Sequence, residues 1–160
     1  MRRWFLVLGC ALAAWLSASC AGGGGNADGS GVTPASQFLR TGADVVVVDF
    51  FDMYCHTCQS AASHVNDLHA MVQKRGLGSR IEFYAVGVNN TAMEADLYRT
   101  RFHVPFAVIA DRERTLASRY GVERPPVLIA LRKSGSGWKE IYRTTDPTVP
   151  GEEILAKIQP

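Results

Sequence analysis

The chain has 160 residues, of which 47% are hydrophobic and 20% are charged, and its formal net charge at pH 7 is +2. This length allows one domain of ordinary size and excludes a two-domain enzyme, and the composition is that of a globular protein. The 17 basic and 15 acidic residues form no basic stripe, which argues against nucleic-acid binding, and four cysteines are too few for a disulfide scaffold.

Residues 1–19 are predicted to be an export signal. A short basic start, Arg2-Arg3, precedes an apolar run over residues 4–16, and three small residues follow before Cys20. The apolar run is shorter than the roughly 20 residues that a spanning helix needs. An uncleaved membrane anchor is therefore the weaker alternative.

Cys20 is the candidate lipidation site. The segment 16–20 resembles the lipobox of bacterial lipoproteins, in which the cysteine becomes the acylated first residue of the mature chain. It departs from the usual pattern because Leu16 lies four positions before Cys20 rather than three. Ordinary signal cleavage, which releases a soluble protein, is the alternative. The glycine-rich segment 20–32 is predicted to be a flexible tether, which suits a domain anchored at a membrane surface.

We expect the folded domain to cover residues 33–160 and to lie in the bacterial periplasm. Cys10 would leave with the signal, and Cys20 would be acylated or removed. The domain would then keep Cys55 and Cys58 as its two thiols.

Strands and helices are predicted to alternate along this domain. Residues 45–51 form a β-branched apolar run, typical of a strand buried on both faces of a sheet. Residues 58–74 carry apolar side chains at helical spacing. The other expected helices are 33–40, 91–102, 112–120 and 151–158, and the other expected strands are 81–88, 106–110, 127–131 and 140–143. This order predicts an α/β fold, with a central sheet flanked by helices.

The pattern that carries chemistry is Cys55-His56-Thr57-Cys58, where the first strand gives way to the long helix. Unpaired N–H groups and the positive end of the helix dipole favour a thiolate at the first cysteine. A thiolate attacks a disulfide, and a second cysteine one turn further can displace the mixed disulfide. A C-x-x-C pattern after a buried strand therefore indicates a redox pair.

The motifs around these cysteines resemble the thioredoxin-like proteins, and more closely their exported TlpA/ResA-type thiol-disulfide oxidoreductases. Asp49-Phe50 lies six and five residues before Cys55, as in the thioredoxin pattern. Residues 120–122, Tyr-Gly-Val, are followed by Pro125-Pro126 and an apolar strand, which matches the segment with the family's cis-proline. Residues 104–111 look like the extra segment of the exported branch.

The resemblance implies a thioredoxin fold, with a central mixed β-sheet flanked by α-helices, and it implies roles for four residues. Cys55 would be the attacking thiolate and Cys58 the buried resolving thiol. Asp49 would help to deprotonate Cys58, and a cis bond before Pro126 would shape the substrate groove. Two alternatives stay open: a structural Asp49 that accepts a backbone hydrogen bond, and an ordinary trans turn at Pro126.

The resemblance also implies an enzyme with protein partners and without a cofactor. Its substrates would be proteins that carry disulfides or thiols, and an envelope electron-transfer partner would reset it. Reduction in cytochrome c maturation is one role known in the exported branch. We expect a monomer that contacts a membrane only through the lipid on Cys20.

The active-site sequence departs from the common Trp-Cys-Gly-Pro-Cys of thioredoxins. Tyr54, His56 and Thr57 stand at the positions that tune the redox potential. A protonated His56 would stabilise the thiolate of Cys55, whereas a solvated one would do little. Pro125 removes a backbone N–H from the expected groove.

Other functions of the cysteine pair are less well supported. Covalent haem attachment needs C-x-x-C-H, but Gln59 follows Cys58. A peroxiredoxin would have proline and threonine closely before its cysteine, and Asp52-Met53-Tyr54 offers neither. A structural disulfide would close too small a loop to stabilise much. The serious alternative is a copper- or zinc-binding metallochaperone that uses both cysteines and a histidine. The candidate histidines are His56, His64, His69 and His103.

Overall fold

The computed structural model describes residues 31–160, in which five strands form one mixed sheet with the order β3-β2-β1-β4-β5. Strands β1, β2 and β3 are parallel, whereas β4 is antiparallel to both β1 and β5. Their bounds are β1 Val45–Phe51, β2 Ile81–Val88, β3 Ala107–Asp111, β4 Val127–Ser134 and β5 Gly137–Thr144.

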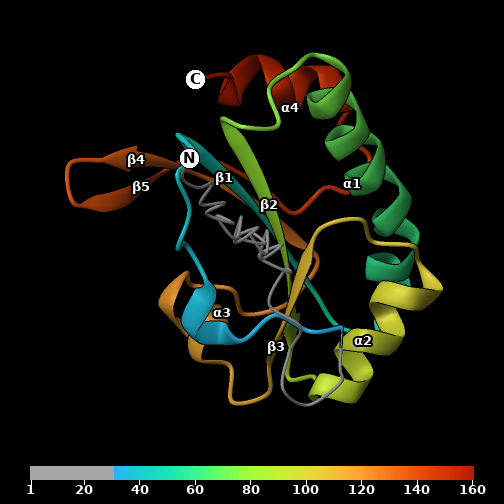
Figure 1. Cartoon of the computed structure of the whole chain (residues 1–160). Helices are drawn as coiled ribbons and strands as arrows, with labels where there is room; N and C mark the ends of the chain where they lie inside the picture. Colours follow the sequence, from blue (N-terminus) through green and yellow to red (C-terminus); the bar gives the residue numbers. More distant parts are fainter. Residues whose placement is uncertain (1–30) are drawn as a thin grey trace, which may run out of the picture.

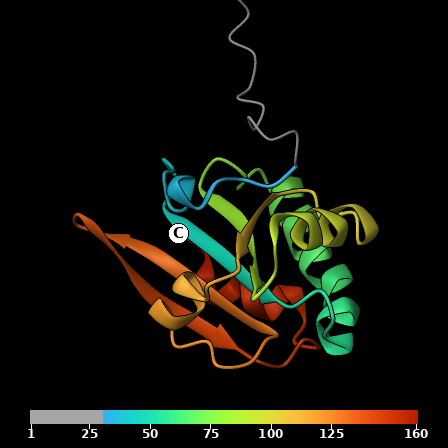
Figure 2. The same cartoon turned by 90° about the horizontal axis from the view of Figure 1, so that it is seen from below.

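Helices cover both faces of this sheet (Figures 1 and 2). The helices α1 (His56–Lys74), α2 (Ala92–Arg101) and α4 (Gly151–Ile158) pack on one face, where their apolar side chains share clusters with β1. The short helix α3 (Thr115–Arg119) and the 3₁₀ turn η1 (Ala35–Gln37) lie on the other face. The expected α/β fold with a central mixed sheet flanked by helices is confirmed.

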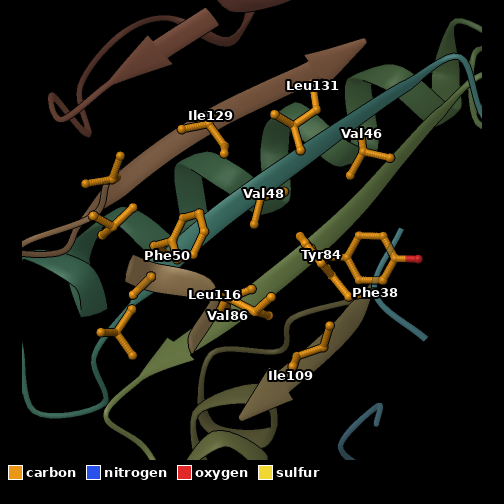
Figure 3. Packing of buried hydrophobic residues seen from close by; sticks show 14 residues of the cluster. Phe38, Val46, Val48, Phe50, Tyr84, Val86, Ile109, Leu116, Ile129 and Leu131 are labelled. Carbon is orange, nitrogen blue, oxygen red and sulfur yellow. The ribbon is translucent and has the colours of Figure 1, made fainter. Parts of the chain in front are cut away.

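The central strand β1 is buried along its whole length, and its side chains alternate between the two faces. Figure 3 shows Val46, Val48 and Phe50 on the face that Phe38 and Leu116 cover. The side chains of the other parity belong to the opposite face, where Val45, Val47 and Phe51 pack with helices α1, α2 and α4. The same alternation directs Asp49 to the face that carries α1.

The elements form where the sequence predicted them, but several bounds differ. Strands β4 and β5 extend beyond the expected ranges 127–131 and 140–143, and two of the expected helices are shorter. The expected helix over residues 33–40 is wrong: only η1 forms, because Phe38 is extended and Leu39 has a left-handed backbone with φ of 61°. Helix α3 starts three residues later than expected because Arg114 is also left-handed, with φ of 56°. The carboxylate of Asp111 then accepts the N–H groups of the first turn of α3.

The expected signal at residues 1–19, the lipidation site Cys20 and most of the expected tether lie outside the described residues. Val32, the last residue of the expected tether, is 7% exposed and shares a cluster with Phe51 and Cys58. Within residues 31–160, no helix combines the length and the apolar character that crossing a bilayer requires.

Candidate functional site

Cys55 caps the amino end of α1. Its backbone is extended, and its Sγ accepts a hydrogen bond from the N–H of Cys58 at 3.2 Å. Its carbonyl oxygen accepts the N–H of Gln59 at 3.0 Å, which starts the helical hydrogen-bond pattern. The sulfur is half-buried and lies at the positive end of a 19-residue helix. A donated N–H and the helix dipole both favour a thiolate at this position.

Cys58 lies one turn inward and is 1% exposed. Burial raises the pKa of its thiol, and the neighbouring Cys55 adds to the effect. The carbonyl of Cys58 accepts a hydrogen bond of 2.9 Å from the buried hydroxyl of Tyr98 on α2. Both cysteines are free thiols. The pair therefore combines an accessible sulfur with a covered one that needs a base to ionise.

Asp49 supplies a carboxyl group on the same face of the sheet. It is 5% exposed, and burial raises its pKa to about 7. Its negative charge is close enough to contribute to the raised pKa of the Cys58 thiol. A carboxyl group that titrates near neutral pH can both accept and return a proton.

The peptide bond between Pro125 and Pro126 is cis. It lies directly before β4, and the carbonyl oxygen of Pro125 is 3.9 Å from the Sγ of Cys55. Both prolines are partly exposed. The loop that contains them therefore forms one wall beside the accessible sulfur, and a trans turn at Pro126 is excluded.

The three expected tuning residues lie at the surface around Cys55. His56 and Thr57 are both exposed. Tyr54 is 74% exposed, and its hydroxyl donates a hydrogen bond of 2.6 Å to Glu94 of α2. This bond raises the pKa of Tyr54 and lowers that of Glu94. The ring of Tyr54 is thereby held across the rim of the site.

The loop before the cysteines depends on a buried amide that the sequence reasoning missed. Asn90, which is 1% exposed, accepts the N–H of Met53 at 2.9 Å and donates to the carboxylate of Asp52 at 3.2 Å. Gln59 donates to the carbonyl of Met53 at 2.8 Å. A Cβ on Gly87 would lie 3.1 Å from Asn90, so any larger residue there would have to displace this side chain. The sequence does contain one signal that could have drawn attention to Asn90: the capping-box pattern Thr91-x-x-Glu94, which places Asn90 directly before the start of a helix.

The histidines that were candidates for a metal site lie in different environments. The ring of His69 packs 5.1 Å from that of Phe83 and 5.3 Å from that of Phe106. His103 is exposed beyond the end of α2. Across residues 31–160, no three His, Cys, Asp or Glu side chains come together as a group that could hold a metal ion.

A parallel βαβ unit with a C-x-x-C at the start of its helix, facing a cis-proline before an antiparallel strand, defines a thioredoxin-type fold and site. The sequence profile of the thioredoxin-like family matches residues 42–136. The chain belongs to this family.

Relatives and solved structures are similar over most of the described residues. The chain is 27% identical over 99 residues to the thiol-disulfide oxidoreductase ResA of Geobacillus thermodenitrificans, which covers 62% of this chain and 55% of that protein. With ResA of Geobacillus kaustophilus it shares 25% identity over 118 residues, or 72% and 63% of the two chains. The chain thus spans little more than half of the curated relatives that it matches.

Two crystal structures illustrate the shared fold. A putative thiol:disulfide interchange protein DsbE from Chlorobium tepidum superposes with a TM-score of 0.60 at 22% identity, covering 74% of this chain and 82% of that one. A secreted Mycobacterium tuberculosis disulfide oxidoreductase has a TM-score of 0.56 at 14% identity, covering 72% and 80%.

Proposed function

We propose that this protein is a thiol-disulfide oxidoreductase that acts on other proteins in the bacterial envelope through Cys55 and Cys58. The observation that carries the proposal is the unequal pair: a half-buried sulfur that caps a helix beside the Pro125 carbonyl, and a covered sulfur near a buried carboxyl group. The similarity to oxidoreductases named ResA supports the same reaction.

The first step is the attack of the Cys55 thiolate on a substrate disulfide. A bond forms between Cys55 Sγ and one substrate sulfur, and the other substrate sulfur leaves as a thiolate. The N–H of Cys58 already donates to Cys55 Sγ, so the attacking anion needs no rearrangement to be stabilised. The loop with the cis Pro125–Pro126 bond is the surface against which the substrate would lie.

The second step closes the Cys55–Cys58 disulfide. Cys58 gives its proton to the carboxylate of Asp49, its thiolate attacks Cys55 Sγ, and the second substrate sulfur leaves as a thiolate. Because burial raises the pKa of Cys58, a nearby base is needed for this step at neutral pH. A carboxyl group whose pKa burial raises to about 7 suits that role. The reverse sequence would oxidise a substrate dithiol, and the chain's own residues require no cofactor for either direction.

The first experiment measures reduction of the insulin disulfides with dithiothreitol as the electron source. The protein carries Cys10→Ser and Cys20→Ser, so that Cys55 and Cys58 are its remaining thiols. We expect Cys55→Ser to abolish turnover, because serine caps the helix but cannot exchange disulfides. Cys58→Ser should accumulate a mixed disulfide that mass spectrometry detects, because the resolving sulfur is missing.

The matched control for these variants is Ser63→Ala, an exposed position on the same helix. It should keep the turnover of the parent protein. Full insulin reduction by the Cys55→Ser variant would overturn the proposal. So would a Cys58→Ser variant that turns over at the parent rate without a mixed disulfide.

The specific substrate that we propose is an oxidised C-x-x-C-H segment, as found in apocytochromes c before covalent haem attachment. The protein would then act as a reductant in cytochrome c maturation. Preferential reduction of an oxidised C-x-x-C-H peptide over a peptide with the same cysteines and a scrambled sequence would support this role. Equal rates for both peptides would contradict it.

The location that we propose is the periplasmic side of a membrane, reached through a signal over residues 1–19 and a lipid on Cys20. The tether over residues 20–32 would leave the domain over residues 33–160 free to meet its partners as a monomer. Incorporation of a labelled fatty acid that disappears in Cys20→Ala would support this arrangement. Unlabelled parent protein in the soluble fraction would contradict it.

A further inference from the structure

A small cavity lies between α1, β1, β4, α4 and the segment that joins β5 to α4. Its volume is about 30 Å³, which is enough for one or two water molecules. Asp49 lines it from β1, and Pro126 lines it from the loop beside Cys55. The cavity therefore shares Asp49 and Pro126 with the site that holds the two cysteines, although neither cysteine lines it.

The cavity connects a buried group to an exposed one. Asp49 is 5% exposed, whereas His64 of α1 also lines the cavity and is exposed to solvent. Ala61 and His64 are three residues apart, so they lie on the same side of α1. His64 thus forms an exposed part of the cavity wall. It lies one helical turn beyond Ala61, which itself lies one turn beyond Cys58.

Three titratable side chains line the cavity: Asp49 from β1, His64 from α1 and Asp146 from the segment before α4. The lining residues from β4 and α4, Leu128 and Ile154, are apolar. The carboxylate of Asp146 accepts hydrogen bonds from the N–H and the hydroxyl of Thr148, and these bonds lower its pKa. Asp146 is therefore ionised at neutral pH. In the same pH range, imidazole groups in general exchange protons with water.

We propose that His64 is a proton-relay residue, which passes the proton of Asp49 through the water of this cavity to solvent. This proposal rests on the proposed thiol-disulfide exchange, and it adds the route by which that reaction exchanges its proton. His64 does not touch the substrate or the reacting sulfurs, so it acts through Asp49.

The proton balance follows the second step of the exchange. Cys58 transfers one proton to Asp49 while its sulfur bonds to Cys55 Sγ and a substrate thiolate leaves. Asp49 then gives this proton to a water of the cavity, which gives a proton to His64, and the imidazolium releases it to bulk water. The reduction of the enzyme disulfide runs the same route inward. No electron leaves the sulfur atoms along this path.

The test follows single turnovers of the reduced protein, with Cys10→Ser and Cys20→Ser, mixed with bis(thionitrobenzoate) disulfide in dilute buffer. Attack by Cys55 releases the first thionitrobenzoate, and attack by Cys58 releases the second. At pH 6, below the pKa of about 7 that burial gives Asp49, most of this carboxyl group starts protonated and must lose its proton through the relay before it can accept that of Cys58. We therefore expect His64→Gln to leave the first release unchanged and to slow the second about tenfold at pH 6. This loss is smaller than the ~10²-fold that a group acting directly contributes, because water still exchanges protons slowly.

Chemical rescue separates a relay from a structural role. Added imidazole should restore the second release in His64→Gln towards the rate of the parent protein, and it should leave the parent rate unchanged. The matched control is His103→Asn, an exposed histidine that does not line the cavity, and it should behave as the parent. Asparagine suits that position because residue 103 has a left-handed backbone with φ of 52°.

Two results would overturn the relay. One is a second release in His64→Gln that matches the parent in dilute buffer, and the other is a slowed release that imidazole does not restore. Failure of the proposed function gives a different pattern: the parent protein would show no thionitrobenzoate release that depends on Cys55.

Discussion

Asp49 is the residue of the central strand whose burial costs the most free energy, because its side chain carries a carboxyl group. Asp49 lies among apolar side chains in β1, with all seven residues of the strand buried. Ionising a carboxyl group there removes charge from water without an equivalent replacement, which is the reason that burial raises its pKa to about 7. The burial that suits Asp49 to the proton-acceptor role that we propose therefore also destabilises the folded protein at neutral pH.

The pH dependence of stability should expose this cost. The folded pKa of Asp49, about 7, lies above its ordinary value of 3.8. Between these two values the unfolded chain has lost the proton and the folded protein keeps it, so stability falls as pH rises through this window. The shift corresponds to about 4 kcal/mol at most. Urea unfolding at several pH values should show a shallower decline from pH 4 to pH 8 in Asp49→Asn than in the parent.

Asp146 provides a control of opposite sign. Its pKa is lowered by the hydrogen bonds from Thr148, so it stabilises the folded protein above its ordinary pKa, and this stabilisation is lost as pH falls through the lowered value. Asp146→Asn should therefore lower stability above the ordinary pKa of this carboxyl group, and the difference from the parent should disappear on the acidic side of the profile. Parallel profiles for Asp49→Asn and the parent would contradict the assignment of a raised pKa to Asp49.

The sequence was informative about those site residues whose chemistry is local. Cys55 and Cys58 could be recognised because the strand, the spacing and the start of a helix are all readable within a few residues. Asp49 stood out because a carboxylate within a β-branched apolar run is unusual. Asn90 and His64 could not be assigned roles, because each acquires its role from a distant segment: the Met53 loop for one, and the β5–α4 connection for the other.

At the scale of elements, helix α2 is the part that covers Cys58. Tyr98 of α2 stacks on Phe51 of β1 with ring centroids 3.7 Å apart, and its hydroxyl donates to the carbonyl of Cys58. Tyr54 and Glu94 make a second link between α2 and the active-site loop. Helix α2 is therefore tied to the site at its buried side and at its exposed rim.

Removing the buried hydroxyl tests the first of these links. Tyr98→Phe keeps the stacked ring and leaves the Cys58 carbonyl without one partner, so we expect a loss of about 1 kcal/mol in the free energy of unfolding. Urea unfolding measures this loss. Leu97→Ala, at a side chain that is 53% exposed on the same helix, should change stability by less than about 0.5 kcal/mol. An equal effect of both substitutions would mean that the hydroxyl contributes nothing specific.

Element types were predictable, whereas several ends were not. Strands β1 and β2 matched their expected bounds, as did helix α4, because their apolar patterns end sharply. Helix α1 starts at His56, two residues before the expected position, because the Cys55 side chain itself acts as the cap. The end of η1 depends on a left-handed Leu39, and a leucine gives no sequence signal for that conformation.

At the scale of the whole molecule, the last helix closes the face that carries the site. Ile154, Leu155 and Ile158 of α4 pack in a cluster with α1 and β1. Ile154 also lines the cavity beside Asp49. The end of the chain thus supports a site that begins about a hundred residues earlier in the sequence.

Truncating one side chain of α4 should therefore destabilise the entire domain. Leu155 is 0% exposed, and Leu155→Ala should lower the free energy of unfolding by about 2–5 kcal/mol, because it loses buried area and leaves a cavity. A loss of this size is a large share of the stability of an ordinary domain. Gln159→Ala, at an exposed position just beyond the helix, should shift the urea midpoint little. A small effect of Leu155→Ala would show that α4 is not part of the cooperative unit.

The overall topology could be anticipated further than its details. A βαβ unit followed by a hairpin and a helix allows few arrangements, since parallel crossovers are right-handed. The resemblance carried by Asp49-Phe50, the cysteine pair and Pro126 then selected one of them. The lengths of β4 and β5 were underestimated, because their polar outer ends form a ladder that has no apolar pattern to reveal it.

The placement of His56 and Thr57 has a consequence for how such a protein evolves. Both residues are exposed, although they lie between a capping cysteine and a fully covered one. Substitutions at exposed positions away from special contacts usually change stability by no more than about 0.5 kcal/mol. Both positions should therefore accept substitutions at little cost in stability. The redox potential that we expect them to tune could then change without any change in the core.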